Sequence, residues 1–379
     1  MIITRGLQEW ACLLPQDLPF APVARLLGWQ TQEPVVCEST IRNLVRIHAQ
    51  IVHQAQKAEV AALLERSDLD TLKPQLVLTS HTPRRRAGWP QALSEAVDTA
   101  LIAGETRAPE GVSPADWERV VFARREEAHR CVEDLRHLGP ALETDQVLAT
   151  VDEVLTRKPQ KRCFWELRTA KIVTPEGVRY LSGTGDAFVL MLTVFLQVCL
   201  GQDRYLLVIA DGARWIRAWY QGLACGLQES CLLLDWYHLC KKCIELASMI
   251  CRGKRAKKPL LKVVLGSLWQ GEVAEAIAAL QTHRPEAKNI AKLDELIGYL
   301  QDRALYIPNY RKRRRERRYI GSGHVEKTND LLVAKRQKGH GMHWSLETSE
   351  ALATLQTLML NGGWERYWRD REVLPLVAA

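Results

Sequence analysis

Three acidic residues stand in this sequence where a carboxylate could hold a divalent cation. Asp152 follows the apolar segment 146–151, Asp211 closes the apolar segment 205–210, and Glu326 lies near the start of an expected helix. Carboxylate oxygens suit hard divalent cations, and two such ions about 3.5–4 Å apart promote phosphodiester displacement. Taken singly, each acid has an ordinary alternative, because strand-end acids are common and Glu326 could be an ion-pair partner. Together they predict metal-dependent chemistry on phosphate.

The first carboxylate has one competitor in the sequence. Asp145 precedes the apolar segment 146–151, whereas Asp152 is expected to end it as a strand. Ligand and catalytic groups in open α/β sheets collect at the carboxyl ends of strands. This position favours Asp152.

Basic residues accompany these acids and gather in runs. The chain of 379 residues has 52 Lys and Arg against 44 Asp and Glu, a net charge of +8, with runs at 84–86, 252–258 and 311–318. A stripe of cations can follow a phosphate backbone, so DNA is the expected partner, although any one run could be a solvated face. The cations expected to contact DNA are Arg42, Arg46, Arg84, Arg85, Arg86, Arg311, Lys312, Arg313, Arg314, Arg315, Lys335, Arg336 and Lys338.

The composition indicates a soluble globular protein, with 47% hydrophobic and 25% charged residues. No signal peptide is visible, and no uncharged apolar run reaches about 18 residues, so we expect no membrane span. Ten Cys at irregular spacing fit a reduced, cytoplasmic protein, associated with the nucleoid if it binds DNA. Cys240 and Cys243 form a lone CxxC without a second pair, which does not favour a zinc site.

Alternating strand and helix patterns predict an α/β sheet from about residue 146 onward. The expected strands are 146–152, 168–173, 178–181, 205–212 and 230–235. The expected helices are 187–200, 213–223 and one carrying His238, followed by an almost wholly helical stretch from 240 to 310.

The amino-terminal part is expected to be helical. A helix over 22–29 and another over 41–51, capped by Ser39 or Thr40 and carrying Arg42 and Arg46, suit either a helix-turn-helix or a plain helical hairpin. Further helices are expected at 55–66 and 117–138. The predicted organisation is a helix-turn-helix-like DNA-binding region (1–75), a helical linker (76–144), a first core part (145–240), a helical insertion (241–310) and a final core part (311–379).

Three motifs in order resemble one family. The segments Ile209 to Ile216, Leu234 to Leu239 and Gly321 to Glu326 are similar to those of bacterial insertion-sequence transposases of the ISKra group, which are related to Mutator-like transposases. The resemblance covers about residues 145–370. It implies a ribonuclease-H-like core in which Asp152, Asp211 and Glu326 form a DDE triad holding two Mg²⁺ ions, with Mn²⁺ as a substitute. The 115-residue gap from Asp211 to Glu326 (326 minus 211) resembles the helical insertion of these enzymes.

The second motif, Asp235-Trp236-Tyr237-His238, is similar to the C/D-x-x-H motif of Mutator-like enzymes. The resemblance implies that His238 helps to position DNA at the active site. The alternative is a buried imidazole that pairs with Asp235 for packing. Trp215 and Trp236 are expected in the core, whereas Trp344 is interpreted either as a stacking platform for an unpaired base or as a core residue.

The leading hypothesis is a DNA transposase that cuts and joins transposon ends. Its partners would be double-stranded end and target DNA, and bringing two ends together implies a homodimer on DNA. One alternative is a catalytically inactive DNA-binding protein derived from such an enzyme. Mg²⁺-dependent strand cleavage would distinguish the active enzyme from this protein. Another is a nuclease on the same core, which would give no joined product.

Overall fold

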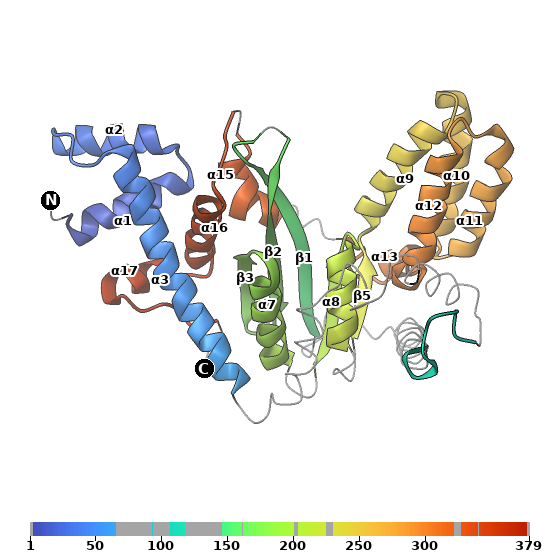
Figure 1. The fold of residues 1–379 in the computed structure, drawn as a ribbon, viewed down its shortest axis with the longest axis horizontal. Coiled ribbons are helices and arrows are strands. Elements are labelled where there is room, and N and C mark those ends of the chain that lie inside the picture. The colour runs from blue at the N-terminus through green and yellow to red at the C-terminus, as the bar shows by residue number, and fades with distance from the viewer. Residues whose placement is uncertain are drawn as a thin grey trace. The chain divides into compact units, whose positions relative to one another are not determined.

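The structure is a computed structural model that describes residues 3–65, 93, 107–117, 146–160, 162–200, 204–224, 230–321, 327–339 and 341–376. The chain divides into two compact units, each made of segments distant in sequence (Figure 1). Unit 1 comprises residues 1–80, 147–201 and 323–379, and unit 2 comprises residues 81–146 and 202–322. Except for Trp117, the expected helix 117–138 lies outside the described residues, as does the triplet Arg84, Arg85 and Arg86.

The described strands form a five-stranded mixed sheet, which confirms the expected α/β class. Its strands are β1 (Gln146–Arg157), β2 (Phe164–Thr174), β3 (Gly177–Gly183), β4 (Tyr205–Ala210) and β5 (Ser230–Leu234). The strand order is β3-β2-β1-β4-β5. Strands β1, β2 and β3 pair antiparallel, whereas β4 and β5 pair parallel.

The prediction that Asp152 ends a strand is wrong. Strand β1 continues to Arg157, and Asp152 lies within it opposite Thr169 of β2. The continuation has a physical cause: Val154 and Thr156 are buried, so the strand keeps an inward-facing row beyond the acid. The strand was expected to end at Asp152 because the apolar run stops at Val151.

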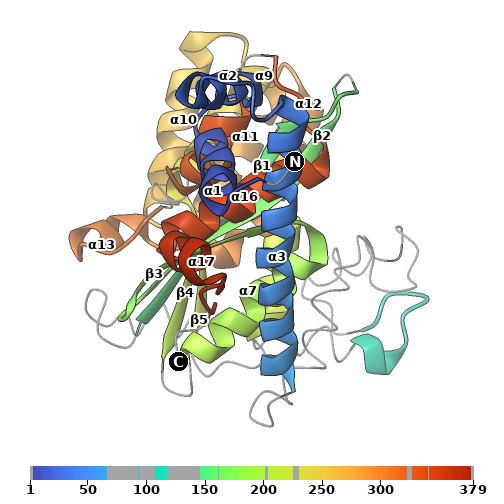
Figure 2. The same cartoon turned by 90° about the vertical axis from the view of Figure 1, so that its left-hand side faces the viewer.

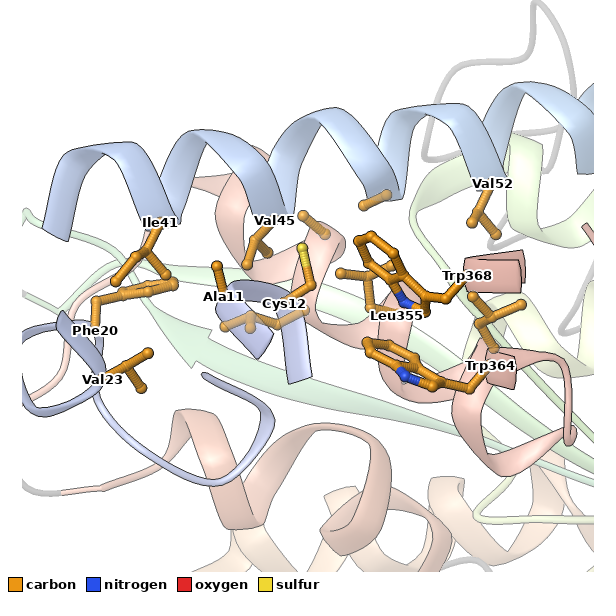
Figure 3. Close-up of a cluster of buried hydrophobic side chains, with 14 of the residues drawn as sticks. Ala11, Cys12, Phe20, Val23, Ile41, Val45, Val52, Leu355, Trp364 and Trp368 are labelled. Carbon is orange, nitrogen blue, oxygen red and sulfur yellow. The ribbon is translucent and has the colours of Figure 1, made fainter. Parts of the chain in front are cut away.

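Unit 1 adds helices to strands β1 to β3. They are α1 (Arg5–Leu13), η1 (Leu14–Gln16), α2 (Phe20–Thr31), α3 (Glu38–Leu64), α7 (Gly185–Leu200), a π-helical turn η5 (Asp330–Ala334), α15 (Lys335–Gln337), α16 (Leu346–Leu360) and α17 (Trp364–Asp370). Helix α3 packs along α16 and also contacts α7 (Figure 2). A buried cluster joins α1, α2 and α3 to α16 and α17 (Figure 3).

Helix α3 is longer than the sequence suggested. The predicted helices 41–51 and 55–66 form one continuous helix, because neither Gly nor Pro interrupts the chain between them. Its N-cap is Cys37, and the predicted caps Ser39 and Thr40 lie in the first turn, where their hydroxyls contact the Cys37 thiol. Burial of Ile41, Val45 and Val52 on one face fixes α3 against the cluster of Figure 3.

Unit 2 combines strands β4 and β5 with α8 (Arg214–Ala224) and a helical bundle (Figure 1). The bundle consists of α9 (Trp236–Ile250), α10 (Lys254–Trp269), α11 (Val273–Thr282) and α12 (Ile290–Asp302). The short turns η3 (Arg284–Glu286) and η4 (Ala304–Tyr306) and helix α13 (Tyr310–Arg315) complete it. The predicted helical stretch over 240–310 is therefore confirmed.

Within the described ranges, no helix combines the length and apolar character needed to span a lipid bilayer. The cysteines that the structure describes are all free thiols. Among them, burial raises the pKa of Cys243 to about 12, which keeps this member of the CxxC pair protonated.

Candidate active site

Asp211 lies directly after β4, as predicted. Its Oδ1 atom accepts a hydrogen bond of 2.8 Å from the backbone N–H of Ala213, just before α8 begins. Gly212 has φ of +73°, a conformation that residues with a Cβ rarely adopt. A Cβ there would also lie 2.7 Å from Leu234 Cδ1. Glycine therefore permits the sharp turn that places Asp211 at the end of its strand.

Gly212→Ala should destabilise unit 2 by more than about 1 kcal/mol, because alanine adds both backbone strain and overlap with Leu234. Urea unfolding measures this loss. Gly266→Ala is the matched control: Gly266 lies inside α10 with open space around it, so alanine there should be neutral or stabilising by up to about 1 kcal/mol. Equal stabilities for the two variants would contradict this reading of the turn.

Asp235 organises the second motif. This carboxylate is only 1% exposed and caps α9, with Oδ1 accepting from the N–H groups of Tyr237 at 2.6 Å and His238 at 3.2 Å. Its Oδ2 atom lies 3.4 Å from Nδ1 of His238. The carboxylate and the half-buried imidazole therefore lie side by side at ion-pair distance, and a phosphate contact by the same ring would use Nε2.

The motifs around Asp211, Asp235 and Gly321 meet within unit 2. The N–H of Asp235 donates to the Ala210 carbonyl at 2.8 Å, and that of Trp236 donates to the Ile320 carbonyl at 3.0 Å. Gly321 approaches so closely that a Cβ would lie 2.7 Å from Tyr237 Cδ2. The segment that continues toward Glu326 thus starts against the turn of the Asp235 motif, next to the end of β4.

Arg303 braces the Asp211 turn from the helical bundle. At the end of α12, its Nη2 atom donates to the Gly212 carbonyl at 3.0 Å, and its guanidinium carbon lies 4.1 Å from the centre of the Tyr299 ring. Burial and the charge of Arg217 hold the pKa of Arg303 below its ordinary value. No sequence signal pointed to Arg303, because the contact joins residues 91 positions apart.

Asp152 has its own environment in unit 1. Its Oδ1 atom accepts from the N–H of Glu153 at 2.8 Å, and its Oδ2 atom accepts from the side-chain amide of Asn329 at 2.6 Å. On neighbouring β2, partial burial and the charge of Lys327 hold the pKa of Lys171 below its ordinary value. The positive charge of Lys327 therefore acts on Lys171, which lies on the strand next to Asp152.

Glu326 lies outside the described residues. The described residues resume at Lys327 and include Asn329, which follows Glu326 by three positions. Asn329 was missed as a site residue, because its partners Asp152 and Thr169 lie 177 and 160 positions away in the chain. Among the described residues, no group of three or more His, Cys, Asp or Glu side chains could hold a metal ion.

Several of the predicted DNA-binding cations have partners inside the protein. Arg313 is 4% exposed and donates to the Tyr319 carbonyl at 2.8 Å, while buried Arg336 donates to the Pro15 carbonyl. Arg46 bonds to Thr348 and Ser345 of the α16 N-terminus, and Arg42 pairs with Glu38. Lys335 pairs with Asp17 at 2.8 Å. Each of these five cations therefore has an intramolecular contact, although the Lys335 side chain remains 63% exposed.

The remaining described cations of the prediction are exposed. They are Arg311, Lys312, Arg314, Arg315 and Lys338, of which Lys312 lies 3.9 Å from Glu316. Four of them belong to α13, around the buried anchor Arg313. This short helix therefore presents a row of guanidinium and ammonium groups to solvent.

Replacing Arg311, Arg314 and Arg315 with Ala should weaken DNA binding at every sequence and flatten its dependence on salt. Each lost phosphate contact should reduce the log–log salt slope by about 0.9 on duplex DNA. Fluorescence anisotropy at several salt concentrations gives the slope. The matched control removes Arg284, Lys292 and Arg366, which changes the net charge equally but takes cations already paired with Asp294, Glu295 and Glu372. Equal slopes for both triple variants would show that α13 is a solvated face.

Trp344 occupies a core position in unit 1. It is 7% exposed, its Nε1 atom donates to the Gln337 carbonyl at 2.9 Å, and its ring packs near Phe20 and Arg336. This placement is that of a core residue, since the ring is covered by the protein itself. Trp236 packs against Trp269 and Tyr310 but is only half-buried, so it lies at the margin of the core that was expected for it.

No protein-family model matches this chain, and no curated protein matches it either. The class of protein is therefore described by its fold and by the geometry of its site. That class is a mixed α/β protein in which an acid-bearing turn, a capped Asp-x-x-His motif and a glycine approach meet beside a helical bundle.

Proposed function

We propose that the chain is a DDE transposase that cuts and joins transposon-end DNA. The observation that carries the proposal is the meeting of three separate sequence motifs in unit 2. The Asp211 turn, the Asp235 motif and Gly321 are joined by backbone hydrogen bonds and by a close glycine approach, although 110 residues separate the first from the last (321 minus 211). Helix capping accounts for Asp235 and close packing accounts for Gly321, whereas Asp211 after β4 and His238 beside Asp235 are the side chains that the proposed chemistry uses.

The sheet supports the same proposal. The strand order is β3-β2-β1-β4-β5, and Asp211 follows the carboxyl end of β4, where open α/β sheets collect ligand and catalytic groups. Helix α9 begins inside the second motif, and helices α10 to α12 lie between that motif and the third, where the resemblance implies a helical insertion. Contact of Arg303 with Gly212 gives that insertion a direct role in shaping the Asp211 turn.

In the proposed mechanism, the carboxylates of Asp152, Asp211 and Glu326 are the groups that would hold two Mg²⁺ ions. Oxygen donors such as those of Asp152 and Asp211 fit Mg²⁺ and Mn²⁺ and disfavour softer metals. When bound, the ions would activate a water or a 3′-hydroxyl and stabilise the leaving oxygen. Asp235 orients His238 toward DNA, and the exposed cations of α13 hold the phosphate backbone.

The experiment that tests this proposal uses linear DNA carrying the reading frame with its flanks. Purified protein and Mg²⁺ should nick or cut at defined positions in both flanks, and a chelator should stop the reaction. Denaturing gels map the cuts. Binding without any metal-dependent cut would favour the inactive DNA-binding alternative instead. Cuts without any joined product would favour the nuclease.

A further inference from the structure

Both oxygens of the Asp152 carboxylate are held from different directions. Oδ1 accepts a hydrogen bond from the backbone N–H of Glu153 at 2.8 Å, and Oδ2 accepts one from the side-chain amide of Asn329 at 2.6 Å. The first bond joins neighbouring residues of the same strand. The second arrives from 177 positions away and fixes the carboxylate relative to another segment of unit 1.

Thr169 fixes which end of the Asn329 amide faces Asp152. Its hydroxyl donates to Asn329 Oδ1, so the amide N–H₂ is the end that points to Asp152. Thr169 is fully buried and is the cross-strand partner of Asp152 in the β1–β2 pairing. The three side chains therefore form one hydrogen-bonded chain from β2 through Asn329 to β1.

The segment carrying Asn329 is anchored against the same strands. Directly after Asn329 the helix widens into the π-helical turn η5, a feature that often accompanies functional sites. Leu332 and Val333 of that turn are buried against Val154 of β1 and Leu167 of β2. Asn329 consequently approaches Asp152 from a packed support, in the same segment that carries Glu326 three positions earlier.

We propose that Asn329 is a positioning residue that sets the Asp152 carboxylate for a divalent cation, with Thr169 orienting its amide. The inference rests on the proposed function, because it assigns Asp152 a metal. A fixed carboxylate needs no reorganisation when the cation arrives, and hydrogen-bond partners of metal ligands typically contribute 10- to 100-fold to metal affinity. The contrasting interpretation is that the bond only fastens η5 to β1.

The test measures Mn²⁺ binding to the metal-free full chain by calorimetry, together with Mg²⁺ titration of DNA cleavage. Asn329→Ala should weaken Mn²⁺ binding by about 10- to 100-fold and shift cleavage to higher Mg²⁺ concentration. Thr169→Val keeps the shape of the side chain but removes the orienting hydroxyl, and should produce a smaller change in the same direction. Thermal unfolding confirms that each variant is folded.

Asn361→Ala is the matched control. Asn361 likewise makes two amide bonds within unit 1, both to the backbone of Tyr180 at 2.9 Å, but away from Asp152. It should lose thermal stability while keeping wild-type Mn²⁺ affinity. The positioning role would be overturned by wild-type Mn²⁺ affinity in both Asn329→Ala and Thr169→Val. It would also be overturned if Asn361→Ala lost as much Mn²⁺ affinity as Asn329→Ala. Failure of the wild-type protein to bind Mn²⁺ would overturn the proposed function itself.

Discussion

Asp211→Asn should abolish Mg²⁺-dependent cleavage of transposon-end DNA while leaving DNA affinity unchanged or higher. Asparagine keeps the oxygen that accepts the Ala213 N–H, so the turn after β4 should survive. The lost negative charge weakens metal capture but does not weaken attraction to phosphate. Because even outer partners of metal ligands are worth 10- to 100-fold, we expect a loss above about 100-fold for a direct ligand. Cleavage rates test the loss of activity, and fluorescence anisotropy tests the unchanged or higher DNA affinity.

Asp294→Asn provides the control for this prediction. Asp294 belongs to the same unit, is half exposed and pairs with Arg284 on the surface of the bundle. The same chemical change there should leave cleavage at the wild-type rate, because a surface ion pair contributes little. Retained cleavage in Asp211→Asn would remove Asp211 from the catalytic role, and a loss in both variants would point to general damage.

Glu326→Gln should give a folded protein with near-normal DNA affinity and no cutting or joining. Glutamine preserves size and hydrogen-bonding capacity but removes the charge that a divalent ion needs. We expect a loss above about 100-fold in Mg²⁺ and partial recovery in Mn²⁺. Single-turnover cleavage in each metal measures both effects.

Glu316→Gln separates catalysis from charge pairing. Glu316 is the acid inside the basic run and lies 3.3 Å from Arg318 and 3.9 Å from Lys312. If Glu326 served only as a similar ion-pair partner, the two Gln variants would behave alike, with altered DNA affinity and preserved cutting. Loss of cutting in Glu326→Gln alone is the result that the DDE assignment predicts.

Most strands and helices of the described core could be predicted because their hydrophobic patterns are local. The apolar run at 205–210 and the Asp-Gly that follows it specify β4 and its turn without reference to the rest of the chain. Strand β1 was predicted too short, because its outer half is held by pairing with β2 down to Arg157 and Phe164. That pairing depends on residues outside the strand.

The basic side chains were the least predictable part. Arg313 and Arg336 look like surface cations in sequence, yet backbone carbonyls of Tyr319 and Pro15 receive their guanidinium groups inside the protein. Arginine can be buried when its N–H groups find acceptors, and the sequence does not show which acceptors fold close by. Asn329 and Arg303 were missed for the same reason, since their partners are distant in the chain.

The most direct measurement of the central claim is sequencing of joined DNA. The protein is incubated with Mg²⁺, linear DNA carrying the reading frame with its flanks, and a supercoiled target plasmid. The transposase assignment predicts junctions in which the same terminal nucleotides of the two flanks are joined to many target positions, and none with Asp211→Asn. Cleaved flanks without junctions, or junctions formed equally by Asp211→Asn, would contradict it.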